Sequence, residues 1–347
     1  MKKIEKFLVL VLFLILFLDV NLSAANKLVF LTWSDYIDPE IVNEFQKAFN
    51  IEIKMEYFET DKDRDNKLSL TDGKGYDLVL ITGSTISSYV NRKWITPLDF
   101  SQIPNIKNID NKYLKAFPDT DKFGVPYTWG TVGIAYRKDL VKEKILSWMQ
   151  LYKPQEGFKK RIMMINDPDD VIGLAFKALG YSINSSDDKA LSEAEKLLIA
   201  QKPYVQSYSY IVLSEKSSLV TGDTFMAMTY NGDAVALKKY NPEIVFVVPK
   251  EGTYFWVDYL SILESSNNKK MAMEFINFIN EPKRAAKTAL FLNYATPNKE
   301  AKKLLPNEHL ENQEIYPSED ILSKSEFIQK RPLPVLKKIN SIFSKLK

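Results

Sequence analysis

Residues 27–58 have the sequence KLVFLTWSDYIDPEIVNEFQKAFNIEIKMEYF. Their pattern predicts a strand, a helix and a second strand in close succession. The apolar run at 27–32 is typical of a buried strand. Asp38-Pro39 then predicts the N-cap and first position of a helix, whose apolar face carries Ile41, Val42, Phe45, Ala48 and Phe49. The second strand, at 51–58, follows this helix at once.

The same alternation continues along the chain. A polar helix is expected at 62–71, a turn at 72–75 and an apolar strand at 77–81. From residue 132 the pattern restarts, and the later elements expected are strands at 132–136, 162–165, 225–229 and 244–248 and helices from 168 to Gly180, near 269–280 and at 333–346. Alternating strands and helices predict an α/β fold with a parallel sheet covered on both faces, and the length suits two domains.

The N-terminus has the organisation of a secretory signal peptide. Lys2, Lys3 and Lys6 precede the apolar run at 7–18, and small residues follow, so cleavage is expected after Ala25. A retained transmembrane anchor is the alternative, but this run is shorter than the roughly 20 residues that span a bilayer. The chain has no cysteine, which excludes disulfides, thiolate metal sites and a lipid-anchoring cysteine. We therefore expect a periplasmic protein that is not a lipoprotein.

Charge and motifs exclude several function classes. Cleavage would remove three basic and two acidic residues from a chain of formal net charge +3, leaving about +2. Such a balance gives no electrostatic footprint for nucleic acid. The sequence also lacks the phosphate-loop, dinucleotide, zinc-protease and nucleophile-elbow motifs. Its one histidine, His309, is expected on a solvated helix face and not as a catalytic base. We expect no enzyme, no cofactor, no metal ion and no nucleic-acid partner.

Aromatic residues stand next to carboxylates at the ends of predicted strands, where open α/β sheets bind ligands. The clearest stretches are WSDY at 33–36, INDPDD at 165–170, TYNGD at 229–233 and FWVD at 255–258. Each has another explanation. Trp33 and Trp256 could be core aromatics, Asp167 or Asp170 could cap a helix, and Asn231-Gly232 is a common turn.

Taken together, these stretches favour one ligand class. A buried ammonium group needs carboxylates, because an uncompensated charge in a closed cleft is costly. Aromatic faces attract ammonium groups and also contact the methylenes between them. The combination therefore predicts an aliphatic oligoamine, and it would repel phosphates and dicarboxylates.

The chain resembles the substrate-binding protein of spermidine/putrescine ABC transporters. The segments that carry the resemblance are 32–53, 76–84, 123–139, 178–187, 230–234, 247–260 and 293–305. It implies a two-lobe periplasmic binding protein fold of type II, in which each lobe is a mixed sheet flanked by helices and the ligand cleft lies between them. The first lobe is expected at 26–133 and 258–304, and the second at 134–257 and 305–347.

The resemblance also implies a set of ligand contacts. The matching positions are Trp33, Ser34, Asp35, Tyr36, Thr82, Ser84 and Tyr294 in the first lobe, Asp167, Asp170, Tyr230 and Trp256 in the second, Asp258 at the hinge, and Gln329 near the C-terminus. Ser84 replaces an aromatic residue of the family, and Ile328 aligns with its ligand-binding glutamine, next to Gln329. Asp170 and Tyr230 stand where glutamate and tryptophan are common. These differences leave spermidine only slightly favoured over putrescine.

The resemblance implies the partners as well. We expect a monomer that captures a polyamine and delivers it to the permease subunits of an ABC transporter in the inner membrane. A periplasmic polyamine sensor that signals to a membrane partner is one alternative. A receptor for ferric iron or another cation is a second, although such a site would use tyrosinate and carboxylate oxygens in place of tryptophan walls.

Overall fold

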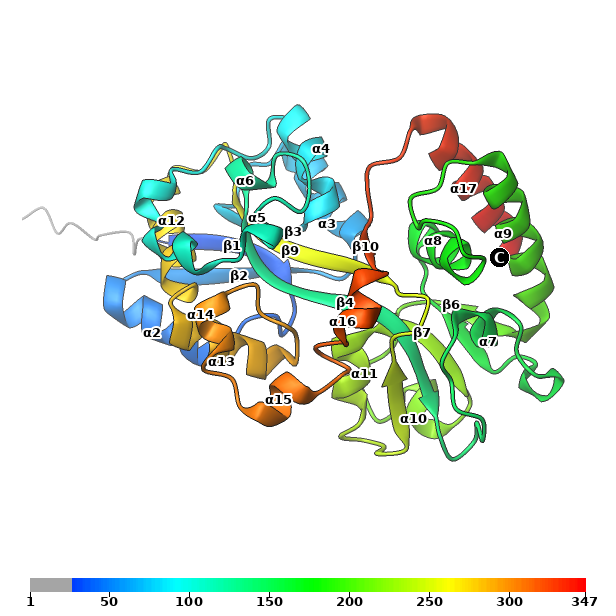
Figure 1. Cartoon of the computed structure of the whole chain (residues 1–347). Coiled ribbons are helices and arrows are strands. Elements are labelled where there is room, and N and C mark those ends of the chain that lie inside the picture. The colour runs from blue at the N-terminus through cyan, green and yellow to red at the C-terminus, as the bar shows by residue number, and fades with distance from the viewer. Residues whose placement is uncertain (1–26) are drawn as a thin grey trace, which may run out of the picture.

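Two lobes stand side by side and are joined by two long strands (Figure 1). The computed structural model describes residues 27–347. Its strands form one sheet with the order β2-β1-β3-β9-β4-β7-β5-β6, to which β10 adds beside β9 and β8 beside β4. The predicted signal peptide at residues 1–25 lies outside the described residues.

The first lobe is built on a parallel strand-helix-strand unit. Strand β1 (Lys27–Trp33) is parallel to β2 (Glu52–Phe58) and to β3 (Leu78–Thr82), and helices α2 (Pro39–Phe49) and α3 (Asp61–Thr71) connect them. The Asp38 side chain accepts a hydrogen bond from the Glu40 N–H and Pro39 opens α2, as predicted. The other elements of this lobe are η1 (Gly83–Thr85), α4 (Ile86–Asn91), η2 (Phe100–Gln102), η3 (Pro104–Asn108), α5 (Asn111–Leu114), α6 (Thr120–Phe123), α12 (Lys269–Ile279), α13 (Pro282–Leu292) and α14 (Lys299–Lys302).

Strands β4 (Val125–Arg137) and β9 (Tyr254–Ile262) cross from one lobe to the other. The first half of β4 pairs with β9, and its second half pairs with β7 and β8. On its other side β9 pairs antiparallel with β3, which places Thr82 opposite Asp258. Every residue of the two crossing strands is buried. The sheet is therefore mixed, and residues 254–258 lie at the junction of the lobes.

The second lobe has a sheet of short strands, each three to five residues long. Its strands are β5 (Ile162–Met164), β6 (Val205–Tyr208), β7 (Met226–Tyr230) and β8 (Ile244–Val247). Its helices are α7 (Trp148–Tyr152), η4 (Glu156–Phe158), α8 (Pro168–Ala178), α9 (Asp188–Gln201), η5 (Lys202–Tyr204), α10 (Ser218–Thr221) and α11 (Asn231–Leu237). Strand β5 is parallel to both β6 and β7. Helix α8 buries Val171, Ile172 and Phe176 against this sheet.

The C-terminal segment packs against both lobes. It contains α15 (Asn307–Glu311), α16 (Glu319–Ser323), β10 (Glu326–Phe327) and α17 (Leu333–Leu346). Leu305, Ile315 and Tyr316 pack in the hydrophobic cluster of the first lobe, whereas α17 packs on α8 and α9. The predicted lobe boundaries stay a prediction, and these contacts favour moving residues 305–316 to the first lobe.

The prediction that His309 lies on a solvated helix face is wrong. Its side chain is only 8 % exposed, and its ring lies 5.9 Å from that of Tyr316. Burial lowers the pKa of His309. The charged neighbours in the sequence face solvent while α15 turns the imidazole inward, and an isolated five-residue helix shows too little periodicity to predict that direction.

Among residues 27–347, no helix is both long and apolar enough to cross a bilayer.

Candidate ligand-binding site

The predicted binding residues come from strand ends and from the crossing strand β9. Tyr36 follows β1, Thr82 ends β3, Tyr230 ends β7, and Trp256 and Asp258 lie within β9. Because the carboxyl ends of parallel strands meet at one edge of a sheet, the loops of each lobe gather there. The loops of the first lobe and those of the second lobe face each other at the junction of the lobes.

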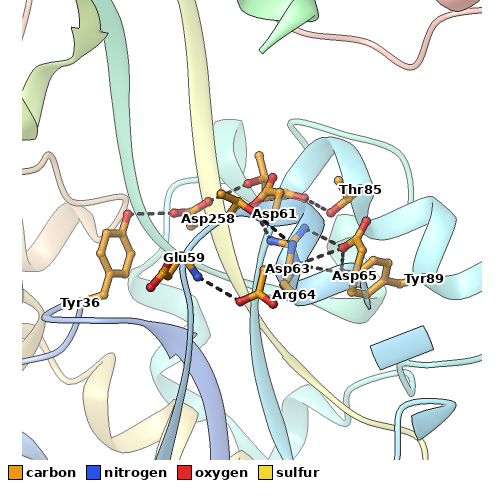
Figure 2. Close-up of polar contacts among 11 residues, drawn as sticks. Tyr36, Glu59, Asp61, Asp63, Arg64, Asp65, Thr85, Tyr89 and Asp258 are labelled. Atoms are coloured by element: carbon orange, nitrogen blue, oxygen red, sulfur yellow. Dashed lines mark hydrogen bonds and ion pairs between the residues drawn. The ribbon is translucent and has the colours of Figure 1, made fainter. Parts of the chain in front are cut away.

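Asp258 is the central acid on the first-lobe side of the site. Its Oδ2 atom accepts a hydrogen bond from the Tyr36 hydroxyl at 2.8 Å, and its Oδ1 atom accepts one from the Thr82 hydroxyl at 3.2 Å. Figure 2 shows the Tyr36 contact. The carboxyl is only 6 % exposed, and burial raises its pKa to about 6, while the two hydroxyl donors lower it. Asp258 is therefore a fixed, desolvated acid.

Asp170 is the matching acid of the second lobe. Both of its carboxyl oxygens accept hydrogen bonds from tyrosines, one from Tyr230 at 3.0 Å and one from Tyr254. Burial raises the pKa of Asp170 well above its ordinary value, and the nearby charge of Asp167 raises it further. Asp167 itself caps α8 by accepting from the backbone N–H groups of Asp169 and Asp170. Burial raises the pKa of Asp167 to about 6.

A chain of aromatic rings connects these two acids. The Trp256 and Tyr294 rings meet edge to face with centroids 4.7 Å apart, Tyr36 lies 6.0 Å from Tyr294, and Tyr230 lies 6.2 Å from Trp256. The chain of contacts runs from Tyr36 in the first lobe to Tyr230 in the second. A linear ligand between the acids would therefore contact rings along its length.

The charges of this site have no cationic partner within the described chain. Neither Asp258, Asp167 nor Asp170 forms an ion pair with a lysine or arginine of residues 27–347, whereas neighbouring Asp169 pairs with Arg331 at 2.9 Å. Buried carboxylates that lack a protein cation are costly unless they are protonated or meet a cation from outside. The site is therefore suited to a cationic ligand with apolar segments.

Comparison with known proteins shows the family of this chain. Residues 40–315 match the model of the family described as bacterial extracellular solute-binding protein. The chain is 32 % identical over 308 residues to the spermidine/putrescine-binding periplasmic protein 1 of Haemophilus influenzae, which covers 87 % of this chain and 84 % of that protein. The chain belongs to the spermidine/putrescine-binding family of bacterial solute-binding proteins.

Further members of the family extend the comparison. The chain is 28 % identical to the norspermidine sensor of Vibrio cholerae over 304 residues, which are 87 % of this chain and 83 % of that protein. The solved structure of the spermidine/putrescine substrate-binding protein PotD from Streptococcus pneumoniae, in complex with calcium and HEPES, superposes with a TM-score of 0.83 at 30 % identity. It covers 93 % of this chain and 98 % of that chain. The two-lobe fold that we expected is thus confirmed, and the family is one of solute-binding proteins, not of enzymes.

Not all of the residues that the resemblance implied gather at this point. Ser34 and Asp35 are exposed beyond the end of β1, where the Ser34 hydroxyl donates to Asp35 at 3.2 Å. Gln329 is also exposed, and its backbone N–H donates to the Asn184 side chain at 2.8 Å. Ser84 lies in η1, half-buried. The Trp33 ring is tilted by 57° against that of Phe58, with centroids 4.5 Å apart. Their roles as ligand contacts remain predictions.

Two site residues were not among the ligand contacts that the sequence analysis named, although Asp233 stands in the stretch quoted there at 229–233. Tyr254 donates to Asp170, although it lies in a run of apolar strand residues that gave no sign of this role. Asp233 lies in the first turn of α11 beside Tyr294, is half-buried, and accepts a hydrogen bond from the Thr229 hydroxyl at 3.4 Å. Burial raises the pKa of Asp233 to about 7. Its position three residues after Tyr230 in the segment YNGDA was the available signal.

Proposed function

We propose that this protein captures a polyamine between its lobes and delivers it to an ABC permease. The observation that carries the proposal is the set of desolvated carboxylates, Asp258 in the first lobe and Asp167 and Asp170 in the second, which lack a lysine or arginine partner among the described residues. Spermidine or putrescine supplies the missing cations at its ammonium groups, and its methylenes contact Trp256, Tyr36 and Tyr294.

Binding is coupled to lobe closure in this proposal. Ligand groups contact both lobes only when the lobes are closed, so the ligand shifts the population toward the closed form. The closed surface then docks on the permease. The names of relatives support the ligand class, and the predicted signal peptide supports export to the periplasm.

A ferric receptor fits the site less well. Ferric iron binds tyrosinate oxygen, but burial raises the pKa of Tyr36, Tyr230 and Tyr294 well above the ordinary value. These phenols therefore stay protonated and donate hydrogen bonds to carboxylates, as the Tyr36 and Tyr230 hydroxyls do.

Thermal unfolding of the mature protein with a ligand panel tests the proposal. The panel holds putrescine, spermidine, spermine, cadaverine, lysine and ferric citrate, with 1,4-butanediol as the uncharged control. A ligand at 100 times its Kd adds about 2.7 kcal/mol of stability. We expect a raised melting temperature with spermidine or putrescine and none with the diol. A shift with ferric citrate and none with any polyamine would reject the proposal.

A second candidate function is sensing, and the similarity to the Vibrio cholerae norspermidine sensor favours considering it. A sensor would bind the same ligand and signal to a membrane partner. Deleting the gene and measuring uptake of labelled spermidine separates the two. Loss of uptake supports transport, whereas normal uptake with a changed polyamine response supports sensing.

A further inference from the structure

Asp61 is an acidic residue that the resemblance does not place in the site. It is the first residue of α3, directly after the loop that follows β2. Figure 2 shows its side chain beside Asp258. The Asp61 side chain is 45 % exposed, and its Oδ1 atom accepts a hydrogen bond from Arg64 at 2.8 Å. Among the described residues, its second oxygen has no hydrogen-bond donor.

Arg64 fixes the position of Asp61. The guanidinium is fully buried, and it also donates to the Tyr89 hydroxyl at 2.7 Å and to Asp65 at 3.2 Å. It lies over the rings of Phe58 and Tyr89, at 5.4 and 5.6 Å from their centroids. These hydrogen bonds and ring contacts hold the Arg64 side chain in one conformation. The hydrogen bond from Arg64 in turn holds the Asp61 carboxylate in a defined position. The group of Asp61, Arg64 and Asp65 still carries one net negative charge.

The charge of Asp61 acts on both lobes. It raises the pKa of Asp258 in its own lobe and of Asp167 across the cleft, and it raises that of Tyr210, a second-lobe residue. Asp61 therefore lies beside Asp258 in its own lobe (Figure 2) and within electrostatic range of Asp167 in the other. Bringing two like charges together opposes closure, and no lysine or arginine of residues 27–347 forms an ion pair with Asp167.

We infer that Asp61 is a further ligand carboxylate, which shares with Asp167 an outer ammonium group and thereby favours a triamine over a diamine. This inference rests on the proposed polyamine function. Asp258 and Asp170 supply two inner acids, which suffice for the two ammonium groups of putrescine. A third ammonium group, as in spermidine, reaches the pair formed by Asp61 and Asp167. Its charge also removes the repulsion between the lobes.

Calorimetric titration of the mature protein with spermidine and with putrescine tests the inference. Asp61→Asn removes the charge, and Asp63→Asn is the matched control, because Asp63 lies in the same helical turn but pairs with Lys67 at 2.9 Å. We expect Asp61→Asn to weaken spermidine binding about five- to tenfold and putrescine binding by less than about twofold, as for a partly exposed charge pair. Asp63→Asn is expected to match the wild type with both ligands.

Two results would overturn the inference while leaving the proposed function intact. One is wild-type spermidine affinity in Asp61→Asn, and the other is an equal loss of affinity for both polyamines. A wild-type protein that binds neither polyamine would instead reject the proposed function. Melting of each variant without ligand checks its folding. If the amide destabilises the lobe, Asp61→Ser, which keeps an oxygen for Arg64, gives the same comparison.

Discussion

Asp258 combines features that suit a ligand contact better than a structural role. It is buried, both carboxyl oxygens accept hydrogen bonds from hydroxyl groups, and no cation of the described chain lies in contact with it. A carboxyl that served only the fold would gain more from an ion pair, such as the one that Asp169 makes with Arg331. The hydroxyl donors orient the charge without cancelling it.

Replacing Asp258 with asparagine is expected to weaken polyamine binding by about 2 to 5 kcal/mol, because it leaves a buried ammonium group without its charge partner. Titration calorimetry measures the loss. The exposed Asp320→Asn is the control, and it should bind as the wild type does. Unchanged affinity of Asp258→Asn for both spermidine and putrescine would remove this residue from the site.

Binding near pH 6 is expected to release protons. Burial raises the pKa of Asp258 and of Asp167 to about 6, so each carboxyl is about half protonated there without ligand. An ammonium group favours the ionised form and expels these protons. Calorimetry at pH 6 in buffers of different ionisation enthalpy counts the released protons, and the part of the count that Asp258 and Asp167 contribute should fall as the pH rises from 6 to 8. Identical heats in all buffers at pH 6 would contradict these pKa values.

The same shifts fix the sign of the stability change. Because the folded pKa values exceed the ordinary value near 4, the stability that these acids contribute is complete below pH 4 and is lost as pH rises through about 6. Ligand charge compensates that loss. Spermidine should therefore raise the melting temperature more at pH 7.5 than at pH 5.

At the scale of elements, the start of helix α11 approaches the first lobe closely. A Cβ atom on Gly232 would lie 2.2 Å from the ring of Tyr294, which follows α13. That distance is far below a normal contact, so only glycine lets α11 meet Tyr294 in this arrangement of the lobes. The helix start is part of the contact between the lobes as well as of the second-lobe fold.

Gly232→Ala is expected to weaken spermidine binding at least about tenfold, because the added methyl group opposes closure. Its melting temperature without ligand should change little if the open form has room for the methyl. Gly157→Ala is the matched control, since a Cβ atom there meets nothing within 4 Å. Wild-type affinity in Gly232→Ala would show that Tyr294 and α11 need not meet for ligand to bind.

The sequence predicted elements well where local signals were strong. Residues 27–58 form the expected strand, helix and strand, because Asp38 and Pro39 mark the helix start and the apolar periods are clear. The crossing strands were harder to predict from the sequence. β4 runs from Val125 to Arg137, but only 132–136 were predicted as strand, since a fully buried strand shows no alternation.

Part of the site was predicted, because aromatic and acidic residues at strand ends are visible in the sequence. Tyr36, Tyr230, Trp256 and Asp258 could therefore be proposed as ligand contacts. The hydrogen bond from Tyr36 to Asp258 spans 222 positions and that from Tyr254 to Asp170 spans 84. Asp61 looked like one more charge on a polar helix, and no local pattern shows that α3 presents it to the cleft.

At the scale of the whole molecule, the lobes share one sheet, and most of their core residues lie in clusters of one lobe, with Tyr294 of the first lobe joining the second-lobe cluster. One cluster holds Trp148, Phe176 and Ile339 of the second lobe, and another holds Phe30, Phe45 and Phe275 of the first. The lobes are joined mainly through β4, β9 and the C-terminal segment, so they can move relative to each other without unpacking either core. A ligand that contacts both lobes can therefore control their closure.

Titration of the mature protein with spermidine at pH 7.5 tests the central claim most directly. Capture between carboxylates of two lobes predicts saturable binding of one spermidine per chain, with a Kd in the micromolar range or below. Adding salt is expected to weaken it, because charge pairs contribute to the affinity. The absence of saturable heat with both spermidine and putrescine, from protein that melts cooperatively, would contradict the claim.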